Sequence, residues 1–361
     1  MEEVGEMIET NRIINGDALT SLKELPNESI NMIMTSPPYW ALRDYGIDGQ
    51  LGLEPHFQEY LNKLCEIFDE VKRVLKKDGT CWVNLGDTYS NSGEKKDGDS
   101  KNSIIKAHRE GHAKKGTKLK NYPPKCLCMI PFRFAIEMQN RGWILRNTII
   151  WHKPNCMPSS VKDRFTVDFE YLFFFVKNKK YWFKKQYEIF ESNEYDRNRM
   201  ANARIEYGGK WAKESGGAIK NQRAFVAGGR EGRNKRTVWS ITTHPFPESH
   251  FATYPEELCE IPIKAGCPKN GIVLDPFFGS GTTGLIALKQ DKGFIGIELN
   301  PKYVKIAQER LRPYLEQTKL INFSQDGNET DDVSLSVPTN RRISQTNTVH
   351  EYKNHLDTIL T

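Results

Sequence analysis

The chain has 361 residues, which is enough for one large catalytic domain with an inserted or appended module. Its formal net charge of +6 at pH 7 is mildly basic and compatible with a polyanionic partner. No apolar run approaches the roughly 20 residues of a membrane-spanning helix, residues 1–10 lack the pattern of a signal peptide, and the seven cysteines are scattered. We therefore expect a soluble, cytoplasmic protein with reduced thiols and no membrane partner.

The N-terminal part of the chain alternates short strands with helices. This alternation predicts a parallel β-sheet, because parallel neighbours need crossover connections. The longest helix is the clearest, since its apolar residues recur in steps of three and four and form one stripe. Two lysines suit its C-terminal end, and Gly79 is expected to stop it. The predicted elements are strand 12–15, helix 18–25, strand 30–34, helix 57–77 and strand 80–85.

The later elements continue this pattern. The run 169–176 is expected to be a strand buried on both faces of the sheet, because almost all of its residues are apolar or aromatic. From about residue 318 the tail is polar without periodicity, which predicts a disordered or loosely docked segment. The remaining predicted elements are helix 131–141, strand 143–151, helix 256–265, strand 272–274, helix 285–289, strand 294–299 and helix 303–311.

Two basic stretches break the alternation. Residues 91–125 carry ten Lys and Arg against four Asp and Glu, and they predict a long loop. Residues 179–238 carry fifteen against seven, with interleaved aromatic residues and three Gly pairs. Basic, aromatic and glycine residues together favour a nucleic-acid contact surface in 179–238, although a solvated insert has the same composition.

A stiff loop follows strand 30–34. Two consecutive prolines, Pro37 and Pro38, exclude both helix and strand ladder there and fix an extended turn. Ser36 presents a hydroxyl in this loop, and Tyr39 presents a large aromatic face. Such a loop can grip a planar group that carries an amine, and open α/β sheets bind their ligands at the carboxyl ends of strands.

A glycine-rich turn links a predicted strand to the next helix. Gly279, Gly281 and Gly284 match the pattern G-x-G-x-x-G, and Glu298 ends the following strand. This arrangement predicts a nucleoside-type ligand close to the backbone, with the carboxylate accepting from ribose hydroxyls. The motif fits both NAD and S-adenosylmethionine. Its late position in the chain and the preceding Asp275 favour S-adenosylmethionine.

Two stretches carry a resemblance to a known family. They are 36–39, Ser-Pro-Pro-Tyr, and 275–281, Asp-Pro-Phe-Phe-Gly-Ser-Gly. Together they resemble the motifs of the amino-methylating DNA methyltransferases, and their order resembles the permuted beta class of that family. In that class the target-recognition region lies between the two motifs, where 179–238 falls. The likeness covers roughly residues 11–313 apart from the basic stretches, and it includes the segments 16–17, 151–155, 239–241 and 250–255.

This resemblance implies an α/β, Rossmann-like fold of S-adenosylmethionine-dependent methyltransferases, with a seven-stranded, mostly parallel sheet and an inserted target-recognition region. In that fold the strand before Asp275 lies beside the strand before Thr35, so that the two loops meet in one pocket. The implied parts are a catalytic half at 11–178 that includes the basic loop 91–125, the target-recognition region at 179–238, a cofactor-binding half at 239–317 and a polar tail at 318–361.

The resemblance also implies roles for the site residues. Glu298 would hold the ribose of S-adenosylmethionine, and Asp17 would hold the adenine amine. The methionine part would be held by Asp275, Phe277, Gly279 and Gly281. The cofactor pocket would be completed by Phe251, Thr253 and Thr282. The catalytic loop would consist of Ser36, Pro37, Pro38 and Tyr39.

The implied reaction is direct methyl transfer to an exocyclic base amine. Such an amine is a poor nucleophile because its lone pair is delocalised into the ring, and acceptors at the Ser36 hydroxyl and the Pro37 carbonyl would free that pair. The base would be flipped out of double-stranded DNA and stacked on Tyr39. Ser at position 36 is typical of family members that methylate N4 of cytosine, whereas Asp or Asn there is typical of those that methylate N6 of adenine. A cytosine-N4-specific, site-specific DNA methyltransferase is therefore predicted.

Other interpretations fit the sequence less well. A catalytically silent DNA-binding protein needs neither loop intact, and a nicotinamide oxidoreductase explains the glycine-rich turn but not the Pro-Pro loop. An adenine target, an RNA substrate, a separately acting restriction endonuclease as partner, and a monomeric or homodimeric state all stay open. No metal site is predicted, because the spacing of His108, His112, Cys126 and Cys128 matches no common zinc site.

Overall fold

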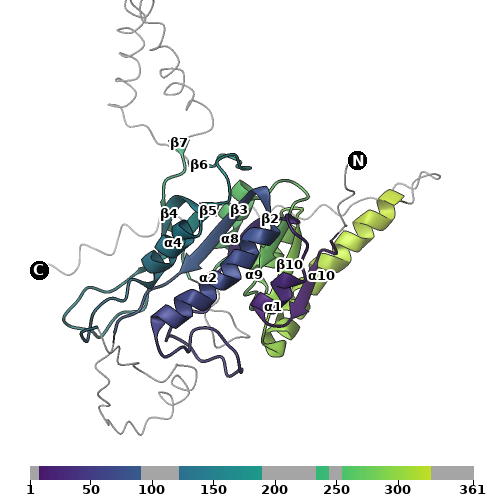
Figure 1. Cartoon of the computed structure of the whole chain (residues 1–361). Helices are drawn as coiled ribbons and strands as arrows, with labels where there is room; N and C mark the ends of the chain where they lie inside the picture. Colours follow the sequence, from purple (N-terminus) through teal and green to yellow (C-terminus); the bar gives the residue numbers. More distant parts are fainter. Residues whose placement is uncertain (1–7, 91–121, 189–232, 244–253, 327–361) are drawn as a thin grey trace, which may run out of the picture. The chain divides into compact units, whose positions relative to one another are not determined.

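The computed structural model describes residues 8–90, 122–188, 233–243 and 254–326 (Figure 1). The chain divides into two units, residues 1–317 and residues 318–361. The sheet, its covering helices and the cavity described below all belong to the first unit. Of the second unit, only the end of one helix, 318–326, is described.

An eight-stranded sheet forms the centre of the first unit, in the order β1-β10-β9-β2-β3-β5-β4-β8. Its strands are β1 (Arg12–Asn15), β2 (Ile30–Thr35), β3 (Leu75–Leu85), β4 (Ile144–His152), β5 (Phe169–Val176), β8 (Val238–Ser240), β9 (Ile272–Asp275) and β10 (Gly293–Glu298). Neighbouring strands are parallel except at β5, which is antiparallel to both β3 and β4. The predicted mostly parallel sheet is therefore confirmed.

The sheet has one strand more than the seven expected. The additional strand is β8, which pairs in parallel with the end of β4 so that Trp239 lies opposite Trp151. With only three residues, β8 is too short to show an alternation of apolar and polar side chains, so its sequence did not predict it. A separate two-stranded sheet pairs β6 (Tyr187–Glu188) with β7 (Arg233–Asn234).

The antiparallel direction of β5 follows from its connection to β4. Residues 153–168 lead from β4 into β5 without a helix, and His152 lies opposite Phe169 at the root of this connection. A hairpin connection of this kind joins antiparallel neighbours, whereas a parallel pair needs a crossover.

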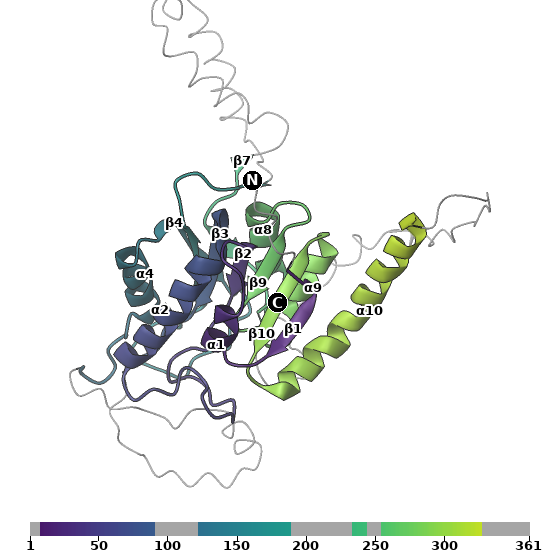
Figure 2. The same cartoon turned by 45° about the vertical axis from the view of Figure 1, so that its right-hand side comes forward.

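Helices cover both faces of the sheet, so the first unit has three layers (Figure 2). On one face lie α1 (Ala18–Lys23), α2 (Phe57–Val74) and α4 (Ile130–Asn140). On the other lie α8 (Glu256–Gly266), α9 (Thr282–Lys289) and the beginning of α10 (Pro301–Asp326). Side chains of β5 enter both cores in alternation: Phe173 and Phe175 point to one, and Leu172 and Phe174 point to the other. The prediction that this strand is buried on both faces is confirmed.

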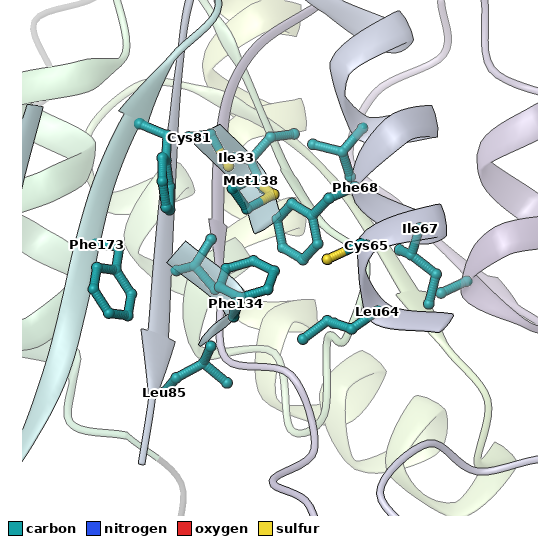
Figure 3. Packing of buried hydrophobic residues seen from close by; sticks show 14 of the residues in the cluster. Ile33, Leu64, Cys65, Ile67, Phe68, Cys81, Leu85, Phe134, Met138 and Phe173 are labelled. Atoms are coloured by element: carbon teal, nitrogen blue, oxygen red, sulfur yellow. The ribbon is translucent and has the colours of Figure 1, made fainter. Parts of the chain in front are cut away.

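The core beneath α2 and α4 explains why α2 was easy to recognise from the sequence. Figure 3 shows Leu64 and Phe68 of α2 gathered with Phe134 and Met138 of α4 above the sheet. The rings of Phe68 and Phe134 meet edge to face with their centroids 5.1 Å apart, an arrangement that aromatic pairs favour. The six residues of the predicted apolar stripe are all buried: Phe57, Leu61, Leu64, Phe68, Val71 and Leu75.

The end of α2 differs from the prediction. The helix ends at Val74, and Leu75 already begins β3, so the two lysines and Gly79 lie in a strand. Leu75 is fully buried and lies opposite Ile30 of β2. Pairing with β2 therefore overrides the local signals for a helix end, as tertiary context commonly does.

Helix α10 is longer than the predicted helix 303–311. The helix runs to Asp326, so the first part of the predicted polar tail, 318–326, is helical and differs from the prediction. Most of three predicted regions lies outside the described residues: the loop 91–125, the target-recognition region 179–238 and the tail 318–361. In the part of the chain that is described, no helix is long and apolar enough to cross a membrane.

Candidate active site

The two predicted loops meet at the carboxyl ends of β2 and β9. These strands are parallel neighbours, with Met32 opposite Val273 and Ile33 opposite Leu274. Each strand runs directly into its loop, so both loops leave the same edge of the sheet. The predicted adjacency of these two strands is therefore confirmed.

A cavity of about 630 Å³ lies between the two loops. Its volume is in the range of small-molecule binding sites. On the side of the loop after β2 it is lined by Ser36, Pro37, Pro38, Tyr39, Asn84, Trp151, Lys153 and Glu170. On the side of the glycine-rich turn it is lined by Asp17, Phe277, Gly279, Thr282, Glu298 and Asn300. The two motifs that resemble one family thus face a common space.

Asp275 ties the two loops together from inside the protein. Its side chain is fully buried and accepts hydrogen bonds from the hydroxyls of Thr35 at 2.6 Å and Thr283 at 2.7 Å. The Tyr254 hydroxyl and the Phe277 N–H donate two further bonds, each of 3.0 Å. Burial raises the pKa of Asp275, and these hydrogen bonds oppose that shift. The carboxylate therefore holds the ends of β2 and β9 and the start of α9 in one position.

Glu298 stands beside the glycine-rich turn. Its carboxylate accepts hydrogen bonds from the N–H groups of Gly279 at 2.7 Å and Asn300 at 2.8 Å. Gly279 and Gly281 have φ angles of +54° and +83°, which favour glycine. A Cβ at position 281 would also lie 3.1 Å from the Ala307 side chain. The turn therefore presents bare backbone and one carboxylate to the cavity.

The Ser36 hydroxyl is oriented by Asn84 of β3. It donates to Asn84 Oδ1 at 3.1 Å, and the Asn84 amide donates to the Tyr171 carbonyl at 3.1 Å. Asn84 is buried, so these partners fix the direction of its amide. Because the Ser36 proton is used in this bond, the lone pairs of the Ser36 oxygen can accept a hydrogen bond from a group in the cavity.

Tyr39 belongs to a connected row of polar groups. Its hydroxyl donates to the Glu170 carboxylate of β5 at 2.6 Å, and the Lys153 ammonium pairs with the same carboxylate. The Lys153 nitrogen also lies 4.4 Å from the centroid of the Trp151 ring. Burial and the neighbouring Glu170 raise the pKa of Tyr39 well above its ordinary value. The phenol therefore stays protonated and acts as a donor.

Comparison with known proteins identifies the family to which this chain belongs. The family N6_N4_Mtase, described as DNA methylase, matches residues 30–309, which is most of the chain and includes both loops. The chain belongs to the DNA methylase family.

Two relatives of this DNA methylase are similar over most of their length. The type II methyltransferase M.Cfr9I of Citrobacter freundii is 43% identical over 314 residues, which cover 86% of this chain and 90% of the relative. The type II methyltransferase M.SmaI of Serratia marcescens is 39% identical over 315 residues, which cover 86% of this chain and 95% of the relative. Among solved structures, the PvuII DNA methyltransferase (cytosine-N4-specific) matches with a TM-score of 0.53 at 21% identity, covering 83% of this chain and 86% of that one. This likeness supports the predicted Rossmann-like methyltransferase fold.

Most of the predicted site residues of this DNA methylase line the cavity. Asp275 and Gly281 do not, because the first is buried beneath the loops and the second shapes the start of α9. Phe251 and Thr253 lie outside the described residues, as do His108 and His112. The predicted residues that do line the cavity are Ser36, Pro37, Pro38, Tyr39, Asp17, Phe277, Gly279, Thr282 and Glu298.

Several polar cavity residues of the methylase were not predicted, among them Asn84 and Glu170. Asn84 and Glu170 are polar residues in mostly apolar strands, at 80–85 and 169–176 respectively. A polar side chain in a buried strand needs hydrogen-bond partners there. This exception to the apolar pattern was the available signal. It points to the cavity only when the strand order β2-β3-β5 is known, because that order brings both side chains near the loop after β2.

Proposed function

We propose that this DNA methylase transfers a methyl group from S-adenosylmethionine to the exocyclic N4 of cytosine at a specific site in duplex DNA. The observation that carries the proposal is the single cavity shared by the loop 36–39 and the glycine-rich turn. One side of the cavity presents a hydroxyl acceptor and an aromatic ring, and the other presents bare backbone and a carboxylate. Two relatives are named type II methyltransferases, and one structural neighbour is named cytosine-N4-specific, which supports the proposal.

The residues around the glycine-rich turn fit S-adenosylmethionine. Glu298 lines the cavity and has oxygens to accept ribose hydroxyls, and Gly279 lets a ligand approach the backbone. Asp17 caps α1 through one oxygen, which accepts the Thr20 N–H at 2.9 Å, and it also lines the cavity, where we assign it to the adenine amine. When bound, S-adenosylmethionine supplies a methyl group that its sulfonium already activates. Asp275 supports this site by holding the turn.

On the acceptor side, the proposed role of Ser36 is to accept a hydrogen bond from the target amine. The hydrogen bond from Ser36 to Asn84 leaves the serine oxygen as an acceptor, and the Pro37 carbonyl is the second acceptor in this proposal. Two such bonds draw the amine nitrogen towards a tetrahedral geometry and release its lone pair for attack. Alignment of two groups in this way contributes roughly 7–11 kcal/mol in well-oriented reactions, so no covalent intermediate is needed.

Identification of the modified base tests the proposal directly. DNA from cells that express the protein is digested to nucleosides, and the modified position is mapped in the intact DNA. The proposal predicts N4-methylcytosine at one short sequence. N6-methyladenine as the sole product would reject the cytosine target, and the absence of methyl transfer to any DNA or RNA in vitro would reject the enzyme itself.

Two substitutions at Tyr39 separate stacking from hydrogen bonding. Tyr39→Phe keeps the ring and loses the donor to Glu170, so kcat/KM for DNA is expected to fall by less than about 10-fold. Tyr39→Ala removes the stacking surface for a flipped base, so kcat/KM is expected to fall by about 10- to 100-fold. Steady-state transfer of a tritiated methyl group measures both values. Equal losses in the two variants would contradict a stacking role.

The pKa of Glu298 predicts how cofactor affinity depends on pH. Burial raises the pKa of this carboxyl above its ordinary value, so it gains a proton at a higher pH than an exposed glutamate does. The ionised form is the better acceptor for ribose hydroxyls, so affinity should be complete above this pKa and fall as the pH drops through it. Calorimetric titration of S-adenosylmethionine from about pH 8 to about pH 5 measures the slope.

Glu298→Gln should bind the cofactor more weakly and lose most of this pH dependence. Glu309→Gln, at an exposed position on α10, is the matched control and should titrate like the wild type. An unchanged slope in Glu298→Gln would assign the dependence to another group.

We also infer the permuted beta-class arrangement, with target recognition in 179–238 and a cognate restriction endonuclease acting separately. The two ends of that region are described, and they lie side by side, as expected for an inserted segment. β6 pairs with β7 there, and Glu188 forms ion pairs with Arg233 and Arg236, each at 2.6 Å. The residues that would read the target lie between these two strands.

A further inference from the structure

Four large apolar side chains in the connection 153–168 between β4 and β5 are exposed, and Met157 and Phe165 are the most exposed of them. Phe165 is 96% exposed and Met157 is 82% exposed. Phe165 is the more exposed of the two, and burying its ring would be worth more than burying the methionine. Neither residue contributes to either hydrophobic core. Their exposure at one connection marks it as a surface for a partner.

The connection is held in place by contacts at its root and near its tip. At the root, the Lys153 N–H donates to the Asp168 carbonyl at 2.7 Å. Near the tip, the Arg164 guanidinium lies 3.6 Å from the centroid of the Tyr89 ring, and Asp163 pairs with Lys125 at 2.5 Å. These contacts attach it to the segments that follow β3 and precede α4, so Phe165 is presented from a supported loop.

The root of this connection is also part of the cavity wall. Lys153 begins the connection and Glu170 follows it by two residues, and both line the cavity beside Tyr39. In Figure 1 the connection is the teal loop that extends beyond the end of β4, on the side where the chain leaves β3. Phe165 is therefore carried by a loop that starts and ends at the proposed binding site of the target base.

The charge of the loop suits DNA. In residues 156–167 the only acidic side chain is Asp163, and Lys125 already pairs with it. Lys162 and Arg164 flank this carboxylate, so the neighbourhood of Phe165 keeps a net positive charge. An apolar side chain surrounded by basic residues matches a duplex, which has phosphates outside and stacked bases within.

We propose that Phe165 enters the duplex and fills the gap left in the base stack when the target base is flipped, with Met157 supporting it from the same loop. This inference rests on the proposed function, since it requires a flipped base. A flipped base loses its pairing and stacking, which costs a few kcal/mol. An inserted aromatic ring recovers stacking with the neighbouring bases and so stabilises the flipped state.

The test compares the wild type with Phe165→Ala, Phe165→Leu and the control Ile136→Ala on short duplexes that carry the mapped target. Ile136 is an apolar residue of α4 with 56% exposure and lies outside the loop. On the fully paired duplex, Phe165→Ala should lower kcat/KM by about 10-fold or more, because no inserted ring then replaces the stacking that is lost when the base is flipped. On a duplex with a mispaired target, the loss should shrink to within about 3-fold, because a mispaired base is easier to flip.

Phe165→Leu should retain most of the activity, and Ile136→Ala should match the wild type on both duplexes. Affinity for S-adenosylmethionine should be unchanged in every variant. Equal losses on paired and mispaired duplexes, or no loss on either, would overturn the proposal. A change in self-association on sedimentation with unchanged kinetics would also overturn it, by assigning the surface to a second copy of the chain. The base methylated by the wild type tests the proposed function separately, because an adenine product would reject the cytosine target without altering the comparison of duplexes.

Discussion

Ser36→Ala should lower kcat by roughly 100- to 1,000-fold, the usual effect of removing one preorganised hydrogen-bonding group from a reaction centre. The hydroxyl donates to Asn84 and so faces the cavity as an acceptor. Alanine removes this acceptor and also removes the hydrogen bond that Ser36 donates to Asn84 Oδ1. Because Ser36 lies on the acceptor side of the cavity, the Kd for S-adenosylmethionine should change little.

Single-turnover methyl transfer measures the chemical step of this variant, and equilibrium titration measures its cofactor affinity. Ser29→Ala is the matched control, because Ser29 precedes β2 as Ser36 follows it, is also half-buried, and donates a hydrogen bond to the Pro26 carbonyl at 2.8 Å. The control should keep full activity. Full activity in Ser36→Ala would remove the proposed amine acceptor from the mechanism.

Asp275→Ala should lower the free energy of unfolding by more than about 3 kcal/mol, because it leaves three buried hydroxyls without their shared acceptor. Those hydroxyls belong to Thr35, Thr283 and Tyr254. The variant should also lose cofactor affinity, because the glycine-rich turn loses the support of the buried carboxylate. Denaturant unfolding measures the first effect, and cofactor titration under native conditions measures the second.

Thr35→Val provides the graded control for this prediction. It keeps the side-chain shape, removes one of the three hydroxyl donors and should cost about 1 kcal/mol. The free energy of unfolding should therefore decrease from the wild type to Thr35→Val and decrease further in Asp275→Ala. A fully stable Asp275→Ala that binds S-adenosylmethionine poorly would instead indicate that this carboxylate contacts the cofactor directly.

The fold was predictable where one local pattern decided the structure. The apolar stripe from Phe57 to Leu75 is buried throughout, and so are residues 172–176 of the aromatic run, so these patterns were sufficient to predict a helix and a strand. Local signals failed where a partner strand decided the outcome. Leu75 joins β3 because it pairs with Ile30, and β8 exists because the end of β4 accepts it. Such pairings cannot be predicted from the sequence of the short segment alone.

The position of the cavity was predictable from the two motifs that border it, but the surroundings of the two carboxylates were not. Asp275 directly precedes the glycine-rich turn, and Glu298 ends the following strand. Asp275 is buried and accepts four hydrogen bonds, whereas Glu298 lines the cavity. The difference arises from β2, which brings Thr35 over Asp275 from 240 positions earlier in the chain. The hydrogen bond from the Tyr39 hydroxyl to the Glu170 carboxylate depends in the same way on the order of β2, β3 and β5.

The order of the strands also governs when the enzyme can first act during its synthesis. β1 pairs with β10, and β2 pairs with β9 on the side away from β3, although each pair is separated by most of the chain. Contacts between such distant segments form late, because a long loop must close first. Until β9 and β10 leave the ribosome, the edge of β2 stays open to unwanted pairing. A nascent chain that already carries the loop 36–39 therefore still lacks the opposite wall of the cavity, which forms only when nearly the whole polypeptide has been synthesised.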